Sequence, residues 1–283
     1  MLVMVCWILD SGYFYQYPVS RIKYLMSNSY FQFKQFTIHQ EQCAMKVTTD
    51  ACLFGAWVAE EVRSQESGVG SRESGVGSRK SGLRSLLDIG TGTSLLAIML
   101  AQKNPEMKID AIEIDNDAAE EAKINVVSSP WKEQINIVQG DVKGLSFEKE
   151  YDLIITNPPF YENEIRSASD SKNVAHHSEN LRLKELLVII KDNLRKTGSF
   201  FLLLPYKRNE EIKKLFKDHE LNISKILFIR QSVKHDYFRI MLKGKLSDQE
   251  NIETEFNEMS IWDDTQQYTT EFKQLLKDYY LHL

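Results

Sequence analysis

From Arg84 onward, apolar residues follow two different spacings along the chain. Short apolar runs are typical of buried strands, and between them apolar residues recur every three or four positions, as on one face of a helix. The pattern predicts strands over Ser85–Ile89, Lys108–Ile114, Gln134–Val138, Tyr151–Thr156, Ser199–Leu204, Asn222–Arg230 and Phe238–Leu242. It predicts helices over Asp50–Arg63, Ser94–Gln102, Asp117–Val127, Leu181–Leu194 and Asn209–Asp218.

This order of elements indicates an α/β fold. Strands that alternate with helices form an open, mostly parallel sheet with helices on both faces. The last two strands follow each other without a helix, which favours an antiparallel hairpin at the edge of a seven-stranded sheet. Ligands of such sheets bind beyond the carboxyl ends of the strands, so residues that directly follow a strand are the candidates for a site.

Two segments lie outside this pattern. The regular pattern begins after Met26, so we interpret residues 1–25 as a dispensable or disordered extension and residues 26–283 as a single domain. A Gly/Ser-rich sequence occurs twice in succession, at Glu66–Arg72 and Glu73–Arg79. Such a composition cannot bury a core, and it predicts a flexible insertion over residues 64–84 with no catalytic role.

Composition excludes several classes of protein. Of the 283 residues, 42% are hydrophobic and 27% are charged, a balance typical of a globular chain. No apolar run reaches the roughly 18–20 residues that a membrane-spanning helix needs. Cys6, Cys43 and Cys52 form no CxxC pair, so we expect no metal site and no disulfide scaffold, but reduced thiols in the cytoplasm. The net charge of −5 leaves any contact with nucleic acid to local basic clusters.

The first candidate motif, Asp88 to Ser94, is the sequence Asp-Ile-Gly-Thr-Gly-Thr-Ser between a predicted strand and a predicted helix. Gly90 and Gly92 allow a tight turn and a close approach of a ligand to the backbone. A dinucleotide-binding fingerprint requires glycine at position 95, where this chain has leucine. The motif therefore favours S-adenosylmethionine, which has no phosphate, over a pyrophosphate-containing cofactor.

Two carboxylates follow the next two strands. Glu113 lies about 20 residues after the glycines, the spacing at which a carboxylate at a strand end binds a ribose diol. Asp115 is the competing candidate, although its position favours the start of the next helix. Asp141 follows Gly140 and is a candidate acceptor for the exocyclic amine of an adenine, with a plain turn residue as the alternative.

The fourth motif, Asn157-Pro158-Pro159-Phe160, follows the strand Tyr151–Thr156. The prolines stiffen the loop, so the Asn157 side-chain oxygen and the Pro158 carbonyl can act as paired acceptors. Paired acceptors would hold the hydrogens of a planar amine and favour the pyramidal geometry that restores its lone pair. Phe160 offers an apolar face on which a flipped base can stack.

Together these motifs resemble class I S-adenosylmethionine-dependent methyltransferases that methylate amino groups. Three further segments, Phe31–Phe36, Cys43–Trp57 and Tyr268–Leu281, are similar to the bacterial tRNA1(Val) (adenine-N6)-methyltransferase family. The resemblance implies a Rossmann-like fold, S-adenosylmethionine as cofactor, and methyl transfer to N6 of adenosine 37 in a valine tRNA, with no DNA or membrane partner. It also implies that the segment from Lys46 to Asp50 folds over the methionine end of the cofactor.

Other substrates stay open at this point. Protein glutamine N5-methyltransferases share the Asn-Pro-Pro-aromatic motif, and an rRNA guanine-N2 methyltransferase is a closer alternative. Ser94 stands where the family often has a third glycine. All three cysteines precede the glycine loop in the sequence, so we expect none of them near a motif, which predicts direct methyl transfer without a covalent enzyme intermediate.

Overall fold

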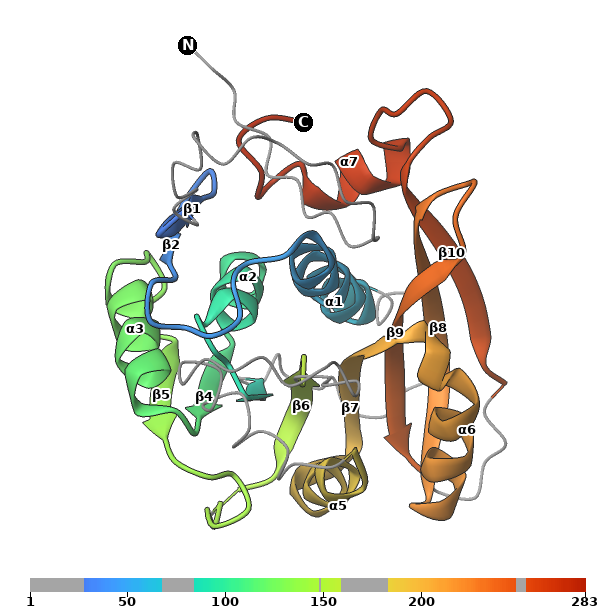
Figure 1. The fold of residues 1–283 in the computed structure, drawn as a ribbon. Helices are drawn as coiled ribbons and strands as arrows, with labels where there is room; N and C mark the ends of the chain where they lie inside the picture. The colour runs from blue at the N-terminus through green and yellow to red at the C-terminus, as the bar shows by residue number, and fades with distance from the viewer. Residues whose placement is uncertain (1–27, 68–83, 148, 159–182, 248–252) are drawn as a thin grey trace, which may run out of the picture.

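An eight-stranded sheet forms the centre of the protein in the computed structural model, which describes residues 28–67, 84–147, 149–158, 183–247 and 253–283 (Figure 1). The strands are β3 (Ser85–Ile89), β4 (Lys108–Glu113), β5 (Ile135–Gln139), β6 (Tyr151–Thr156), β7 (Leu194–Pro205), β8 (Leu221–Ser232), β9 (Tyr237–Leu246) and β10 (Glu255–Trp262). Their order in the sheet is β10-β8-β9-β7-β6-β3-β4-β5. β9 is antiparallel to both of its neighbours, whereas the other neighbouring pairs are parallel.

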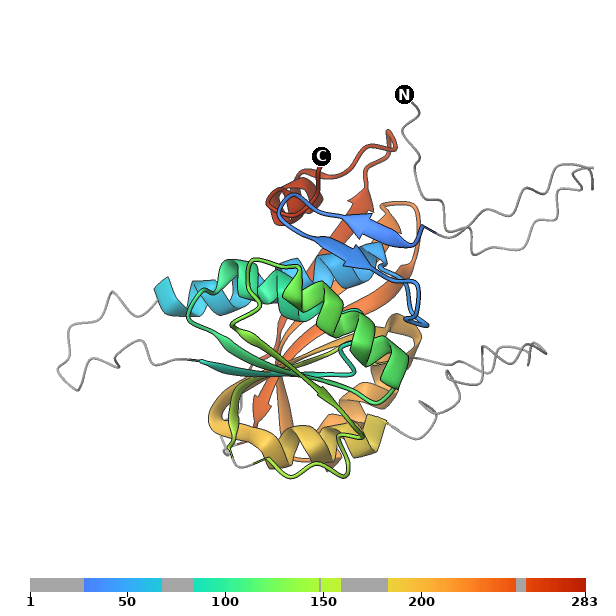
Figure 2. The ribbon, with the colours of Figure 1, turned by 90° about the vertical axis from the view of Figure 1, so that its left-hand side faces the viewer.

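Helices cover both faces of this sheet, as the sequence predicts. They are α1 (Thr49–Ser67), α2 (Leu95–Lys103), α3 (Asn116–Val127), α5 (Leu183–Asn193), the short 3-10 helix η5 (Tyr206–Arg208), α6 (Asn209–Asp218) and α7 (Thr270–Leu276). Figure 2 shows α1, α2 and α3 on one side of the sheet and α5 on the other. Two apolar cores result, one under α1 and α2 and one under α5 and α6.

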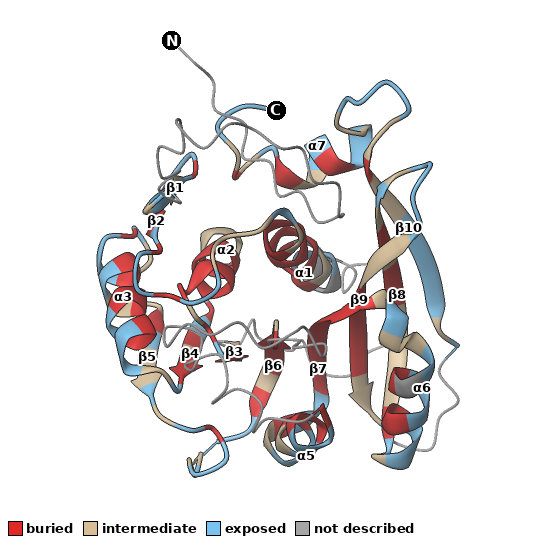
Figure 3. Ribbon diagram, viewed as in Figure 1, coloured by how far each residue is buried: buried red, intermediate tan, exposed pale blue. Residues whose placement is uncertain are grey.

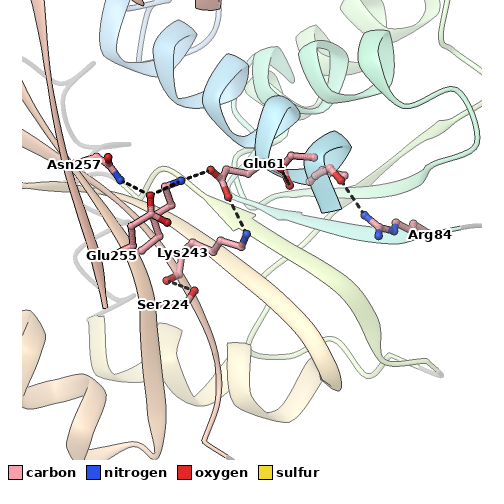
Figure 4. A network of polar contacts seen from close by, with 9 residues as sticks. Glu61, Arg84, Ser224, Lys243, Glu255 and Asn257 are labelled. Carbon is pink, nitrogen blue, oxygen red and sulfur yellow. Dashed lines mark hydrogen bonds and ion pairs between the residues drawn. The ribbon is translucent and has the colours of Figure 1, made fainter. Parts of the chain in front are cut away.

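The helix α1 is the centre of the larger core. Residues Cys52 to Ala59 of α1 are buried on every side, because the helix lies between the sheet, α2 and α7 (Figure 3). Its C-terminal half is also held by a network of ion pairs (Figure 4). Glu61 pairs with Lys243 of β9 at 2.8 Å and with Lys225 of β8 at 2.9 Å. Burial alone would raise the pKa of Glu61, but the hydrogen bonds from both lysines outweigh it and lower the pKa.

The N-terminal and C-terminal segments close the same core. A small hairpin of β1 (Tyr30–Gln32) and β2 (Thr37–His39) lies against the C-terminal segment, where Lys34 N donates to Tyr279 O at 2.8 Å. The Phe33 ring stacks on Phe36 at 4.4 Å between centroids and lies 6.0 Å from the Tyr280 ring. The aromatic residues near both ends of the sequence therefore pack together as one layer over α1.

The fold class is confirmed, and three details of the prediction are wrong. The sheet has eight strands rather than seven, because β10 was not predicted. The β8–β9 hairpin is internal, since β10 pairs with the outer side of β8 and forms the edge itself. Helix α1 continues to Ser67, so the segment from residue 64 begins as helix. The predicted extension over residues 1–25 and both sequence repeats beyond Ser67 lie outside the described residues. No described helix is long and apolar enough to span a membrane.

Candidate active site

The predicted motifs meet at one edge of the sheet, where β6, β3, β4 and β5 end side by side. Ile89 at the end of β3 is in register with Thr156 of β6 and with Ile112 of β4. Thr156 Oγ1 donates to Ile89 O at 2.8 Å, which ties the two central strand ends together. This geometry places the loop after β3 directly beside the loop that begins at Asn157.

The glycine loop adopts the backbone that its sequence requires. Gly90 has a φ of 71° and Gly92 a φ of 54°, both in the left-handed region that favours glycine. Gly90 N and Thr91 N both donate to Ile112 O at 2.9 Å, which fastens the turn to β4. A Cβ at Gly90 would meet no atom within 4 Å, so this side of the loop has room for a ligand. Ser94 also has a positive φ, 62°, in the region that favours glycine.

Asp88 lies fully buried beneath this loop with half of its carboxylate unsatisfied. Oδ2 accepts from Thr91 Oγ1 at 2.6 Å, whereas Oδ1 has no hydrogen-bond partner. Burial raises the pKa of Asp88 to about 7, and the nearby Glu113 adds to the rise. A buried acceptor without a partner is costly, so the site favours a ligand that brings a donor or a positive charge. The ammonium group of S-adenosylmethionine meets that need, and the residues of the loop therefore fit this cofactor.

Glu113 is buried at the end of β4 and binds two backbone amides. Oε2 accepts from Gly92 N at 2.8 Å, and Oε1 accepts from Asp115 N at 3.0 Å. The carboxylate therefore fixes the backbone of the glycine loop at Gly92. Ribose binding by the same group remains a prediction. Asp115 is the N-cap of α3, because its Oδ1 accepts from Ala118 N at 2.9 Å, and the prediction that it starts the helix is confirmed.

Asp141 is exposed after β5 and closes a turn. Its Oδ1 accepts from Lys143 N at 2.9 Å, and Oδ2 lies 3.9 Å from Lys143 Nζ. These are the contacts of a turn residue. Contact with an adenine amine stays a prediction for Asp141.

Asn157 and Pro158 continue directly from β6 at the centre of the edge. Pro158 is buried and Asn157 is half-buried. The strand before them is fixed on both sides, by β3 and by β7. Pro159 and Phe160 lie outside the described residues, so the predicted base-stacking role of Phe160 remains a prediction.

Lys46 and Asp50 have internal partners. Lys46 Nζ donates to Gln40 O and, at 3.1 Å, to Cys43 O. Asp50 Oδ2 accepts from Arg239 Nε of β9 at 2.7 Å. The Lys46 contacts hold the segment before α1, and the Asp50 contact ties the start of α1 to β9. The role at the cofactor that the resemblance implies for both residues stays a prediction.

Glu121 and Asn125 of α3 are functional candidates that the sequence did not indicate. Both side chains are buried. Glu121 Oε1 accepts from Glu41 N at 2.5 Å and from Gln42 N at 3.1 Å, and Oε2 accepts from Cys43 N at 2.8 Å. The partners are about 80 positions away, so no local signal in the sequence could have revealed them.

Asn125 links the same N-terminal segment to the glycine loop. Its Oδ1 accepts from His39 N at 2.8 Å. Its Nδ2 donates to His39 O at 2.8 Å and to Thr93 O at 3.0 Å. Helix α3 therefore holds the segment from His39 to Cys43 against the glycine loop.

Cys43 corrects the expectation that the cysteines lie away from the motifs. Its Sγ lies 3.3 Å from the position that a Cβ at Gly92 would take. The sequence order hid this contact because the N-terminal segment folds back over the loop. Burial raises the pKa of the Cys43 thiol to about 11, with Glu113 and Glu121 adding to the rise. A thiol that stays protonated at neutral pH is a poor nucleophile, so the proximity does not favour a covalent route.

Comparison with known proteins identifies the family. Residues 79–222 match the family model described as methyltransferase small domain. The tRNA1(Val) (adenine(37)-N6)-methyltransferase of Dyadobacter fermentans is 34% identical over 90% of this chain and 98% of its own length. The proteins of the same name from Bacteroides thetaiotaomicron and Yersinia enterocolitica are each 33% identical, over 91% and 89% of this chain and 100% and 92% of their own lengths.

Solved structures share the fold. A predicted O-methyltransferase from Agrobacterium tumefaciens has a TM-score of 0.57 at 13% identity, covering 81% of this chain and 96% of its own. A putative class I S-adenosylmethionine-dependent methyltransferase from Listeria monocytogenes has a TM-score of 0.53 at 13% identity, covering 76% and 68%. The glycine loop, Asp88 and Asn157 lie together at one edge of this shared fold. The family model and the relatives show that the chain belongs to the methyltransferase small domain family and, within it, to the tRNA1(Val) (adenine(37)-N6)-methyltransferase family.

Proposed function

We propose that the protein transfers a methyl group from S-adenosylmethionine to N6 of adenosine 37 in a valine tRNA. The observation that carries the proposal is the position of Asn157 and Pro158, which directly follow the strand beside the glycine loop. The names of relatives that match nearly the whole chain support the tRNA substrate. Such a substrate would place the enzyme in the cytoplasm.

The residues of the site have distinct tasks in this reaction. S-adenosylmethionine, when bound, supplies an electrophilic methyl group on a positively charged sulfur. Asp88 offers its unpartnered Oδ1 to the ammonium group, and the loop around Gly90 lets the cofactor approach the backbone. Glu113 holds the shape of that loop through Gly92 N.

Asn157 and Pro158 act on the amine that accepts the methyl group. The Asn157 side-chain oxygen and the Pro158 carbonyl accept the two amine hydrogens, which favours a pyramidal nitrogen with an available lone pair. Neither residue titrates near neutral pH, so they position the amine rather than remove its proton. The proton leaves to water after transfer, when the methylated nitrogen is positively charged and acidic.

Methyl transfer from labelled S-adenosylmethionine tests the proposal, with total tRNA, ribosomal RNA and release factors as acceptors. Release factors are included as protein acceptors for the alternative of a glutamine N5-methyltransferase. Label on tRNA at an adenosine beside the anticodon is the expected result, and label only on release factors or on rRNA guanosine contradicts it. Asn157→Ala should lower kcat by about 10²–10³ with little change in cofactor affinity. Asn136→Ala is the matched control, since Asn136 is exposed on β5 and its side chain donates to Asp110 Oδ1 at 3.0 Å.

A further inference from the structure

Four aromatic side chains form a continuous cluster on the part of the sheet beyond the active site. We call Tyr206, Phe228, Tyr237 and Phe256 the aromatic cluster. Ring centroids are 5.3 Å apart for Tyr206 and Tyr237, 5.3 Å for Phe228 and Tyr237, and 6.3 Å for Phe228 and Phe256. Phe256 is 60% exposed and the other three are half-buried. Tyr206 and Phe228 pack with one side against the core under α5 and α6, and the remaining ring surface of the cluster is exposed.

The cluster begins at the strand next to the active site. β7 pairs with β6, and Tyr206 directly follows β7 at the edge where Asn157 follows β6. Tyr237 opens β9 at the same edge, because Pro205 at the end of β7 is in register with Arg239. Beyond them come β8 with Phe228 and β10 with Phe256 (Figure 1). Three strand spacings of about 4.8 Å give the cluster a width of roughly 14 Å, the length of about four stacked nucleotides.

Arginine and lysine side chains accompany these rings. The Arg230 guanidinium lies 5.5 Å from the centre of the Tyr237 ring, and its Nε donates to Ser260 Oγ at 2.8 Å. Lys207 and Arg208 follow Tyr206 in η5, and Lys234 lies in the turn between β8 and β9. In a chain with a net charge of −5, this is a local cluster of cations beside the catalytic edge.

Carboxylates border the aromatic cluster on β10 and in the β8–β9 turn. Glu258 of β10 accepts from the Tyr237 hydroxyl and lies 3.6 Å from Arg230, so it orients both side chains. Asp236 is the carboxylate in the β8–β9 turn, and Glu255 neighbours Phe256 in the chain. β10 contributes Glu255 and Glu258, so its end of the cluster is less suited to phosphates than the η5 end, which carries Lys207 and Arg208. A polyanion bound here would run along the side of Tyr206 and Tyr237.

Aromatic rings with an arginine over one of them have the chemistry of a single-stranded RNA site. Bases of an RNA loop stack on such rings and on guanidinium planes, and lysines nearby neutralise the phosphates. We propose that the aromatic cluster binds the anticodon-loop nucleotides that neighbour the target adenosine. This inference rests on the proposed tRNA substrate. It gives the tRNA a second contact, separate from the one at Asn157 and Pro158.

Substitutions at the two ends of the aromatic cluster test the proposal. Tyr206→Ala and Phe256→Ala should each raise the KM for tRNA about 5- to 100-fold, the range for loss of one stacked base. The KM for S-adenosylmethionine and the kcat at saturating tRNA should stay unchanged, and Tyr206→Phe should restore the tRNA KM. Val127→Ala, which removes an exposed apolar side chain at the end of α3, is the control that should change none of these values.

The outcomes separate this proposal from the proposed function. If the unsubstituted enzyme methylates tRNA and the variants have the same tRNA KM as it has, the aromatic cluster does not bind RNA while the proposed function stands. If the unsubstituted enzyme methylates no tRNA, both are overturned. If it methylates a protein and Tyr206→Ala weakens that reaction, the aromatic cluster binds a peptide and our assignment of RNA is wrong. Thermal unfolding of each variant identifies any loss of fold.

Discussion

Replacing Glu121 with glutamine should weaken cofactor binding, although the hydrogen bonds that Glu121 accepts come from backbone amides of the protein. The substitution keeps the size of the side chain but replaces one carboxylate oxygen with a donor group. The carboxylate of Glu121 accepts from three consecutive amides, Glu41 N, Gln42 N and Cys43 N. At least one of those amides would then face an NH₂ group instead of an acceptor.

The magnitude follows from the loss of one hydrogen bond to a buried charged group, about 1.5–3 kcal/mol. The lost hydrogen bond would loosen the packing of Cys43, whose Sγ lies against Gly92, and so disturb the glycine loop. We expect the affinity for S-adenosylmethionine to fall about tenfold, which corresponds to about 1.4 kcal/mol. The midpoint of thermal unfolding should fall by several degrees, because 1 kcal/mol corresponds to about 2–4 °C in proteins of roughly 150–250 residues.

Isothermal calorimetry with S-adenosylmethionine measures the first effect and thermal unfolding the second. Glu120→Gln is the matched control, because Glu120 is the adjacent residue, is exposed, and forms an ion pair with Lys123 at 2.7 Å. It should leave both values unchanged. A Glu121→Gln protein that unfolds at a lower temperature yet binds the cofactor with unchanged affinity would show that the contact is purely structural. That result would show that α3 does not position the glycine loop for cofactor binding.

Three further substitutions test the site. Glu113→Ala should weaken S-adenosylmethionine binding by roughly 1.5–3 kcal/mol, because it removes the carboxylate that holds Gly92 N, and calorimetry that finds unchanged affinity would contradict this role. Ser94→Gly should raise the unfolding temperature by a few degrees, since it relieves about 1 kcal/mol of left-handed backbone strain, and a lower temperature would show that the hydroxyl matters more. Cofactor affinity should weaken as the pH falls below about 7, where Asp88 takes up a proton, and Asp88→Asn should remove that dependence in pH-resolved titrations.

Direct methyl transfer is tested by a cysteine substitution. Cys43→Ser should retain methyl transfer, because burial and nearby carboxylates keep the thiol protonated at neutral pH. Single-turnover assays with labelled cofactor measure the step. A Cys43→Ser protein that binds S-adenosylmethionine but transfers no methyl group would be evidence for a covalent route.

The regular part of the fold followed from local pattern, and the exceptions have physical reasons. Strands such as β6, buried on both faces, have continuous apolar runs that identify them in the sequence. β10 has no such run, because it is an edge strand whose first four residues, Glu255 to Glu258, are exposed. Its pairing with β8 depends on sheet topology, which local periodicity does not encode.

The site was predictable where the chemistry lies at strand ends and unpredictable where it depends on distant contacts. Gly90, Gly92 and Asp88 were found because a strand, a turn and a helix follow one another directly in the sequence. Glu121, Asn125 and the approach of Cys43 to Gly92 were missed, because each joins segments far apart in the chain. Such contacts form only after the N-terminal segment has folded over α3.

Identification of the methylated nucleotide tests the proposed methyl transfer to adenosine 37. The purified enzyme is incubated with labelled S-adenosylmethionine and with total tRNA from a strain that lacks the enzyme, and the labelled tRNA is digested and analysed by mass spectrometry. We expect N6-methyladenosine at position 37 of a valine tRNA, lost in Asn157→Ala and retained in Asn136→Ala. Methylation at a guanosine, or at a glutamine of a protein and at no tRNA adenosine, would contradict it.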